Sequence, residues 1–519
     1  MFFHVLLLLL WSVEGSQCLR ILVYNPVSWR SHQFVFRGLI RGLGDKGHLV
    51  DFYTPLPMPD PPETVNQVKL HDALEEVLAT VDVHEFENCW PLRNMEINYE
   101  ATSFMIQKTA ITGKAFTELL SSNRTYDIVI TEFTLWSEPL SYLAHRFDAL
   151  NVVFTPLLDH PWTNELAGLP DNPSYMMSFQ SKTNGKSFAF YERLKNTFKT
   201  FSQIFGGHRQ LATRGQEIAD AIMRYEGWEN RPKLSEMARD AALILLNTHP
   251  SMSYPYPRAP HVKEVGGMHI TEPEPLPKDL QEFMDNSPEG VIYFSLGTNV
   301  DAKAQTEQVF DVLVNVFKTV NQKVLWKVGP GMPEVKENTK IKMQTWFPQQ
   351  DILAHENLVL FITHGGLQST VEAINYGVPI LGMPIWFDQF KDIEFLTSTG
   401  MGLRLNFDNI TEETLSWSIN EIITNPRYRE QAKKRQSMFR DRPMKPVDEA
   451  IYWIEYVARH GKVLQPASVH LPFYQLYLLD IIGTIIVGLL STLYLVRKVV
   501  RSVSSLCYKN MVQKSKKNQ

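Results

Sequence analysis

The chain has 519 residues, which is too many for one hydrophobic core and favours two domains with additional segments. Its 44% apolar and 21% charged residues are ordinary for a globular protein. The net charge is −5, and residues 497–519 hold basic but no acidic residues, so the rest of the chain has no overall basic character and nucleic-acid binding has no support.

An apolar segment opens the chain. Residues 2–11 read FFHVLLLLLW, the small residues Gly15 and Ser16 follow, and the first core strand is expected near Leu19. This pattern predicts a cleavable secretory signal over residues 1–17. A buried first strand is the less favoured alternative, because the segment runs into another strand with no turn between them.

The first half of the chain alternates strands and helices, which is typical of a parallel α/β sheet. Strands are expected over residues 19–25, 48–53, 127–131, 151–154 and 241–247, and helices over 31–44 and 137–148. Residues 160–240 are helical in pattern and are expected to wall a ligand cavity, although ordinary core packing explains any single residue there. Together these elements predict an N-terminal domain over residues 18–250.

A second alternation follows a proline-rich segment that predicts a linker over residues 251–289. Strands are expected over residues 291–295, 323–327, 341–345, 358–362 and 378–381, and helices over 303–319, 367–376 and 411–424. They predict a second domain over residues 290–475. Two β/α/β halves in one chain indicate two parallel-sheet domains facing a cleft.

The C-terminal region carries a membrane signal. Residues 476–496 are apolar with one charge, Asp480, which is long enough to cross a bilayer. The basic tail of residues 497–519 predicts a cytoplasmic C-terminus and a lumenal body, that is, a single-pass type I protein. Lys516 and Lys517, third and fourth from the end, resemble the dilysine retrieval signal of the endoplasmic reticulum, and a generic basic tail is the alternative.

Several kinds of chemistry have no support in the sequence. The cysteines Cys18, Cys89 and Cys507 are too few and too scattered for a disulfide scaffold, and no CxxC metal pair occurs. No GxGxxG follows a strand and opens a helix, which argues against a nicotinamide or flavin dehydrogenase. The glycosylation sequons at Asn123 and Asn409 agree with a lumenal body, but two are expected by chance in a chain this long.

A strand, a glycine pair and a helix follow one another near residue 364. His364 ends an apolar strand pattern, and Gly365 and Gly366 leave backbone N–H groups open to an anion at the start of the helix. Gln368 and Ser369 fall in the first helical turn, from which they can donate to phosphate oxygens. This segment predicts a phosphate site.

Polar and aromatic side chains surround this phosphate segment in the sequence. Trp346 follows a strand and can stack on a planar base, although a lone tryptophan is more often core. Gln349 can bind a ribose or a base edge, and Glu372 suits a diol better than a diphosphate. Asp388 and Gln389 form the acid–amide pair that commonly grips sugar hydroxyls, whereas such a pair standing alone is by default a solvated loop.

Taken together, Trp346–Gln389 resembles the signature of the animal endoplasmic-reticulum UDP-glycosyltransferases, the glucuronosyl- and glucosyltransferases. Further motifs fit in the same order: VGG (Val265–Gly267), FSLGT (Phe294–Thr298), VLWK (Val324–Lys327) and PVDEAIYWIEYV (Pro446–Val457). The similarity covers nearly the whole chain and is weakest over residues 55–240, where acceptor recognition is expected.

The resemblance implies two Rossmann-like domains of the GT-B type, with the donor held mainly by the second. It implies uracil on Trp346, ribose on Gln349 and Glu372, diphosphate on His364, Gly366 and the helix start with Gln368, Ser369, Ser295 and Thr298 nearby, and sugar hydroxyls on Asp388 and Gln389. Family members commonly have asparagine where this chain has Gln368. The transfer is expected to be inverting, with UDP-sugar as co-substrate and without a metal or other cofactor.

A base for the acceptor hydroxyl is expected in the first half. His32 follows the first strand at the start of the next helix, and by itself such a histidine is more often a polar cap. The resemblance makes it the catalytic base. The family pairs this base with an aspartate, and this chain has Glu132 at that place, one methylene longer.

The donor sugar and the acceptor are less well defined. Glucuronate-using relatives carry an arginine ahead of the VGG motif, and Arg258 is about two residues out of register, which favours UDP-glucose and leaves glucuronate as the alternative. The acceptor is expected to be a small lipophilic hydroxyl compound, as in detoxification. A non-catalytic UDP-sugar-binding membrane protein and a membrane scaffold are the rival functions. The oligomeric state, including a homo-oligomer, is open.

Overall fold

The computed structural model describes residues 18–73, 76, 114–133, 137–157, 160–178, 189–297, 307–329, 332, 335, 339–385 and 388–517. The predicted signal of residues 1–17 lies outside the described residues, as do Cys89 and Thr298. The chain forms two compact units, Met1–Pro466 and Ala467–Gln519, and each is described by itself.

In the described part of the chain, a first sheet of seven parallel strands runs in the order β3-β2-β1-β4-β5-β6-β7. The strands are β1 (Arg20–Tyr24), β2 (Leu49–Thr54), β3 (Val65–Lys69), β4 (Ile128–Glu132), β5 (Leu150–Thr155), β6 (Leu243–Leu246) and β7 (Val262–Glu264). The central strands are buried and largely apolar because helices cover both faces of the sheet.

Alternation along the strands divides the core of this sheet. Ile21 of β1 packs in a cluster with α2 (Arg30–Asp45) and α19 (Pro446–His460), whereas Leu22 packs on the opposite face. Further helices of this part are α6 (Lys114–Ser121), η1 (Glu138–Ser141), α7 (Tyr142–Phe147), α8 (Pro161–Leu166), α9 (Phe190–Gln210), η2 (Leu211–Gly215), α10 (Gln216–Ile222), η3 (Trp228–Asn230) and α11 (Leu234–Met237).

A second sheet holds six parallel strands among the described residues, in the order β10-β9-β8-β11-β12-β13. They are β8 (Val291–Ser295), β9 (Lys323–Lys327), β10 (Ile341–Gln344), β11 (Leu358–Thr363), β12 (Ile380–Gly382) and β13 (Gly402–Arg404). The helices of this part are α12 (Lys278–Asp285), α13 (Glu307–Thr319), α14 (Gln349–Ala354), α15 (Leu367–Tyr376), α16 (Gln389–Ser398), η5 (Phe407–Asn409), α17 (Glu412–Thr424) and α18 (Pro426–Arg440).

Three short strands were absent from the sequence prediction. β3 lies in a region predicted as helix and loop, β13 was not expected, and β7 lies inside the predicted linker of residues 251–289. β7 pairs with β6 at the edge of the first sheet, so the linker begins later than predicted. A three-residue edge strand has too little alternation to stand out in a sequence.

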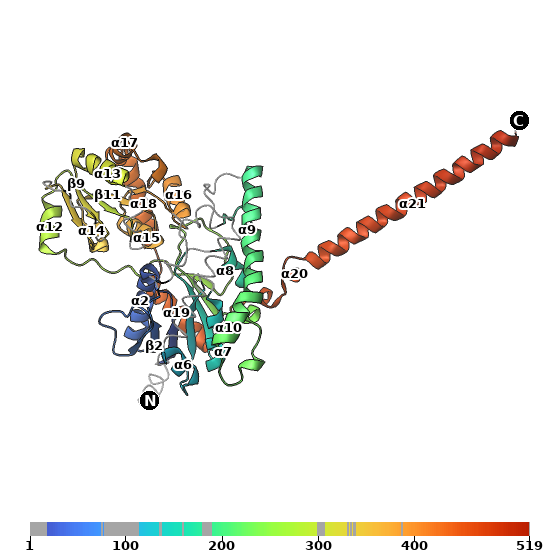
Figure 1. Ribbon diagram of the computed structural model, residues 1–519, viewed down its shortest axis with the longest axis horizontal. Coiled ribbons are helices and arrows are strands. Elements are labelled where there is room, and N and C mark those ends of the chain that lie inside the picture. Colours follow the sequence, from blue (N-terminus) through green and yellow to red (C-terminus); the bar gives the residue numbers. More distant parts are fainter. Residues whose placement is uncertain are drawn as a thin grey trace, which may run out of the picture. The chain divides into compact units, whose positions relative to one another are not determined.

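Helix α19 corrects the predicted second domain of residues 290–475. It packs against α2, β5 and β6 of the first sheet, although α17, which precedes it, packs on the second sheet and α18 packs on α15 and α17 (Figure 1). Ile454 is wholly buried there. The Leu19 N–H donates to His48 Nδ1, which leaves Nε2–H to donate to Glu455 Oε1 over 3.1 Å. The chain therefore returns to the first sheet before the C-terminal unit.

The C-terminal unit contains η6 (Ala467–His470), α20 (Phe473–Leu476) and α21 (Leu479–Lys517). The predicted span of residues 476–496 starts in α20, whereas the long helix begins at Leu479. α21 is the one described helix long and apolar enough to cross a membrane, with a mean hydropathy of 2.1. It continues through most of the basic segment, so residues 497–517 are helical.

Candidate active site

Both sheets reverse their strand order beside the residues expected to bind and react. β1 lies next to β4 in the first sheet, with Tyr24 opposite Thr131. β8 lies next to β11 in the second sheet, with Ser295 opposite Thr363. Open α/β sheets bind ligands at the carboxyl ends of strands where the order reverses. His32 follows β1, Glu132 ends β4, Ser295 ends β8 and His364 follows β11.

The structure brings His32 and Glu132 together. His32 lies in the first turn of α2, and its Nδ1 atom is 2.5 Å from Oε1 of Glu132. Both side chains are buried, and the indole of Trp29 meets the imidazole edge-on at 5.4 Å. A carboxylate accepts from Nδ1–H, so Nε2 is the ring nitrogen left to take a proton from another group.

His364 lies between two glycines. A Cβ atom at Gly297 would lie 2.5 Å from Cε1 of His364, and one at Gly366 would lie 2.7 Å from its Nε2. Gly297 also has φ +86°, which side chains rarely adopt. Burial, together with the positive charge of Lys327, lowers the pKa of His364 to about 4, so its imidazole is neutral at neutral pH.

The start of α15 offers donors for an anion. Gly366 caps the helix without a side-chain hydrogen bond, and the first N–H groups of any helix lack partners within it. The Gln368 Nε2 atom is buried and has no hydrogen-bond partner in the described structure. Ser369 follows in the same turn. The longer amide of Gln368 thus remains available at the helix start.

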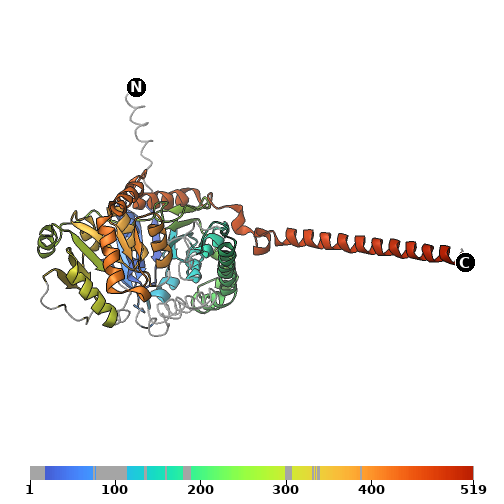
Figure 2. The same ribbon diagram turned by 90° about the horizontal axis from the view of Figure 1, so that it is seen from above.

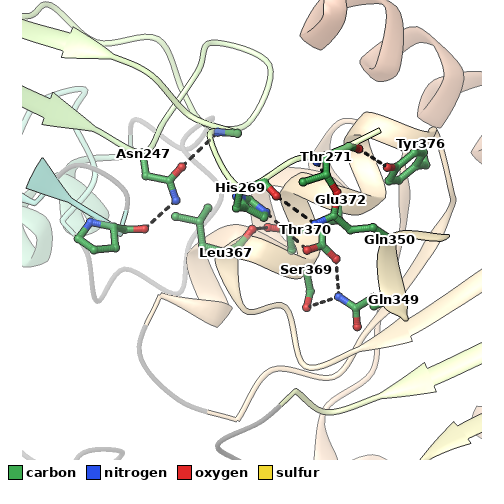
Figure 3. A network of polar contacts seen from close by, with 12 residues as sticks. Asn247, His269, Thr271, Gln349, Gln350, Leu367, Ser369, Thr370, Glu372 and Tyr376 are labelled. Carbon is green, nitrogen blue, oxygen red and sulfur yellow. Dashed lines mark hydrogen bonds and ion pairs between the residues drawn. The ribbon is translucent and has the colours of Figure 1, made fainter. Parts of the chain in front are cut away.

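Gln349, Ser369 and Glu372 form a hydrogen-bonded group (Figure 3). Gln349 Nε2 donates to Oε2 of Glu372 over 2.6 Å and to Oγ of Ser369 over 3.0 Å, and the Tyr293 hydroxyl donates to Gln349 Oε1 over 3.3 Å. Burial raises the pKa of Glu372 to about 7. The amide and the carboxylate therefore hold each other beside the phosphate segment.

His269 joins this group and was missed by the sequence prediction. Its Nε2 atom lies 3.6 Å from Oε1 of Glu372, and burial lowers the pKa of His269 to about 4 (Figure 3). Gln350 anchors the segment around His269 by donating to its carbonyl over 3.1 Å and accepting from the Thr271 N–H over 3.0 Å. The only signal in the sequence was the position of His269 two residues after the VGG motif.

Trp346 is an exposed aromatic residue rather than a core one. Its side chain is 55% exposed, whereas Trp326 of the same sheet is wholly buried. Lys327 Nζ lies 5.1 Å from the centroid of the Trp346 ring and donates to the Gly297 carbonyl over 3.1 Å. Burial lowers the pKa of Lys327 to about 8. Lys327, which the sequence prediction did not single out, thus links the Trp346 ring to the loop beside His364.

Asp388 and Gln389 lie at the start of α16. Both are buried, and Gln389 Oε1 accepts from the Ile385 N–H over 2.8 Å, which holds the preceding loop. Burial raises the pKa of Asp388 above its ordinary value, and His32 lies near enough to Asp388 to interact with it electrostatically. The predicted sugar contact therefore lies close to the predicted base, although the two are far apart in the chain.

No three histidine, cysteine or acidic side chains among the described residues are grouped to hold a metal ion. Of the predicted site residues, Thr298 lies outside the described residues.

Two parallel α/β sheets, each with polar residues at its point of strand reversal, give the chain the fold of the GT-B glycosyltransferases. The solved UDP-glucosyltransferase from Polygonum tinctorium that glucosylates indoxyl, in complex with 3,4-dichloroaniline, has this fold, with a TM-score of 0.57 and 15% identity over 86% of this chain and 99% of that one.

A family model described as UDP-glucoronosyl and UDP-glucosyl transferase matches residues 61–518. The UDP-glycosyltransferase UGT5 of Dactylopius coccus is 32% identical, over 96% of this chain and 94% of its own. The UDP-glucuronosyltransferase 2B16 of Oryctolagus cuniculus is 31% identical, over 83% and 80%. The chain belongs to the UDP-glucoronosyl and UDP-glucosyl transferase family.

Proposed function

We propose that this UDP-glycosyltransferase moves a hexose from a UDP-sugar to the hydroxyl of a small lipophilic acceptor, with inversion and with His32 as the base. The observation that carries the proposal is the buried pair of His32 and Glu132, close to Asp388 at the opposite domain. A base oriented by a carboxylate beside a sugar-binding group is what deprotonation of an acceptor at the anomeric carbon requires.

The steps follow from these positions. Nε2 of His32 takes the acceptor proton while the acceptor oxygen attacks the anomeric carbon, and Glu132 stabilises the imidazolium that forms. The bond to UDP breaks on the opposite face of the sugar. The start of α15 with Gln368 and Ser369 stabilises the charge that develops on the diphosphate, so the mechanism needs no metal or other cofactor.

UDP-glucose is the favoured donor and UDP-glucuronate the alternative. Arg258, the cation that the sequence offered for glucuronate, is engaged by Glu264, with Nε 2.9 Å from Oε1, so it already has a carboxylate partner. Lys391 is the reason that UDP-glucuronate stays the alternative donor. This buried lysine is a cation near Asp388, since its positive charge lowers the pKa of Asp388 while the larger effect of burial raises it. Among the relatives, the rabbit protein is named a glucuronosyltransferase.

α21 serves as the membrane anchor in this proposal. Its apolar first half suits a bilayer, and the basic residues that follow favour a cytoplasmic C-terminus. The catalytic body then lies on the lumenal side of the endoplasmic-reticulum membrane, in which acceptors that partition into lipid are concentrated.

The test uses membranes that carry the full chain. They are incubated with labelled UDP-glucose or UDP-glucuronate and a panel of phenols, beside membranes with the His32→Ala variant. Glycoside formed from UDP-glucose by the parent chain and not by the variant is the expected result. Binding of UDP-sugar without any glycoside would favour the non-catalytic alternative, and equal turnover by His32→Ala would remove His32 as the base.

A further inference from the structure

A short segment joins the two sheets and carries His269. We call residues 265–271 the bridging segment. At one end of it, the Gly267 N–H donates to Asn247 Oδ1 over 3.2 Å, just after β6 (Figure 3). At the other end, the Gln350 amide of α14 donates to the His269 carbonyl over 3.1 Å. The backbone around His269 is therefore held from both sheets.

Helix α2 fixes the same backbone from a third side. A Cβ atom at Gly38 of α2 would overlap the Met268 carbonyl oxygen and lie 3.4 Å from the backbone nitrogen of His269, so the helix and the bridging segment touch directly. Figure 1 shows α2 beside α15, and in Figure 2 the orange helices of the second sheet lie over the blue elements of the first. The helix that carries His32 and the helix that carries Glu372 thus meet the same short segment.

The imidazole of His269 faces one side of α15. Its Nε2 atom lies 3.6 Å from Oε1 of Glu372, and the backbone of Gln368 acts on its pKa against the larger effect of burial. Gln368 and Glu372 are four residues apart, so they share a face of the helix. The ring is buried, and neither of its nitrogens has a hydrogen-bond partner in the described structure. A buried polar ring without a partner is costly, so its place beside Glu372 needs a reason.

The Glu372 carboxylate has one oxygen in use and one open. Gln349 donates to Oε2, whereas Oε1 accepts no hydrogen bond in the described structure and faces His269. Each carboxylate oxygen has two acceptor sites, so each can take one protein donor and one ribose hydroxyl. Donors at both oxygens would fix the plane of the carboxylate for the two adjacent hydroxyls of a ribose.

A neutral imidazole suits this position better than a cation or an apolar side chain. It donates to an ionised carboxylate and accepts from a neutral one, so it serves Glu372 in either state. The other charged or titratable groups that interact with Glu372 among the described residues are Lys327, Asp351, Tyr293 and Tyr376. Lys327 favours the ionised carboxylate and Asp351 the neutral acid. Burial raises the pKa of both tyrosines, which therefore stay neutral.

We propose that His269 is a positioning residue for donor binding: its imidazole closes to hydrogen-bond distance of Glu372 Oε1 when UDP is bound, and so aims the carboxylate at the ribose. The inference deepens the proposed UDP-sugar site and rests on it. The rival role for His269 is packing alone, as a buried ring that fills the space between α2 and α15.

Three variants of the full chain separate these roles. His269→Phe keeps a ring and removes both nitrogens, and His269→Gln keeps an N–H donor. His261→Phe is the matched control. Like His269, His261 is buried, has a pKa lowered to about 4 by burial and has no partner for either ring nitrogen in the described structure, but it precedes β7 at the edge of the first sheet.

Two measurements are made on the detergent-solubilised chain. Isothermal titration gives the Kd of UDP at pH values from 6 to 8, and glycoside formation with one phenol gives kcat and the KM for UDP-glucose. His269→Phe should raise the Kd of UDP and the KM for UDP-glucose about tenfold, with kcat at saturating donor within about threefold. The pH midpoint of UDP binding should rise by about one unit, because ionised Glu372 loses a donor. His269→Gln should recover most of both effects, and His261→Phe should show neither.

The outcomes that contradict the inference are distinct from those that contradict the proposed function. Parental UDP affinity and pH midpoint in His269→Phe overturn the inference. Equal losses in His269→Phe and His269→Gln, or the same loss in His261→Phe, indicate packing and also overturn it. A parent chain that binds no UDP overturns the proposed function itself. If His269→Phe does not fold, as judged by thermal unfolding, His269→Leu takes its place and is read in the same way.

Discussion

The Nδ1 atom of His32 lies 2.5 Å from Oε1 of Glu132, although the two residues are 100 positions apart in the chain. They meet because β1 and β4 are neighbours in a parallel sheet and both end at the same edge. The longer glutamate side chain, in place of the aspartate of the resembling family, still reaches the imidazole. Glutamate in place of the family's aspartate at position 132 therefore leaves the carboxylate–histidine contact intact.

Replacing the Glu132 carboxylate tests its role in orienting the base. Glu132→Gln is expected to lower kcat by about 10²- to 10⁴-fold, because the amide stabilises neither the required tautomer nor the imidazolium. The KM for UDP-glucose should change little, since Glu132 lies on the first sheet. Glu132→Asp is the charge-conserving control, and its kcat should lie between those of the parent and of Glu132→Gln. A Glu132→Gln enzyme with parental kcat would show that the pair has only a structural role.

Trp346 is expected to stack on uracil. Trp346→Ala should weaken UDP binding by about 1–3 kcal/mol, the usual contribution of base–aromatic stacking, which is about five- to 150-fold in Kd. Isothermal titration with UDP measures the change. Trp417→Ala removes a tryptophan of similar exposure, 61% against 55%, and is the matched control. Equal UDP affinity in both variants would place the base elsewhere.

Binding of UDP-glucose should strengthen between pH 6 and pH 8. Burial raises the pKa of Glu372 to about 7, and the ionised carboxylate accepts two ribose hydroxyls better than the neutral acid. The ionised fraction rises from about one tenth to about nine tenths over this interval, so Kd should fall several-fold. His269 stays neutral throughout, because its pKa is lowered to about 4, while Lys327, at about 8, begins to lose its charge at the upper end.

The Glu372 carboxyl has the opposite effect on folding stability, which falls as the pH rises while UDP-glucose binding strengthens. A carboxyl whose pKa is raised by folding contributes stability below its ordinary pKa near 4.5, and this contribution is lost as the pH rises through about 7. Glu372→Gln should therefore flatten the pH dependence of UDP-glucose binding and make the unliganded protein relatively more stable at pH 8. If the profile of the variant matches the parent, another group, such as Asp388, controls binding.

The ion pair of Arg258 with Glu264 bears on donor choice. If UDP-glucose is the donor, Arg258→Ala should leave the ratio of kcat/KM for UDP-glucose and UDP-glucuronate within about twofold, because a guanidinium already held by Glu264 adds little differential transition-state binding. Both donors are assayed with one phenol acceptor. A selective loss of glucuronate transfer would instead assign Arg258 to the glucuronate carboxylate and reverse the donor preference.

The packing of α19 on the first sheet should contribute to the free energy of unfolding. Ile454→Ala removes a fully buried side chain and is expected to destabilise the fold by about 2–5 kcal/mol. Tyr452→Ala, on the exposed side of the same helix, should stay within about 0.5 kcal/mol. Urea unfolding of the detergent-solubilised chain, followed by tryptophan fluorescence, gives both values. Equal effects would mean that α19 contributes no core to the first sheet.

The sequence by itself determined the elements whose signals are contiguous. β8, β9 and α15 have the predicted bounds, because apolar strand runs and helical spacing arise from the backbone periods of neighbouring residues. The phosphate segment around His364 was predictable for the same reason, since strand, glycines and helix start follow one another within a few residues. The family signature came from the same stretch.

The tertiary structure alone decided which distant segments meet. β7 belongs to the first sheet rather than to a linker, and α19 packs on that sheet after the chain has built the second one. An amphipathic pattern shows that a helix has an apolar face, but it does not show which sheet covers that face. The proximity of His269 to Glu372 and of His32 to both Glu132 and Asp388 depends on this packing. Contacts of this kind arise from strand order and long-range burial, which local residue periodicity does not encode.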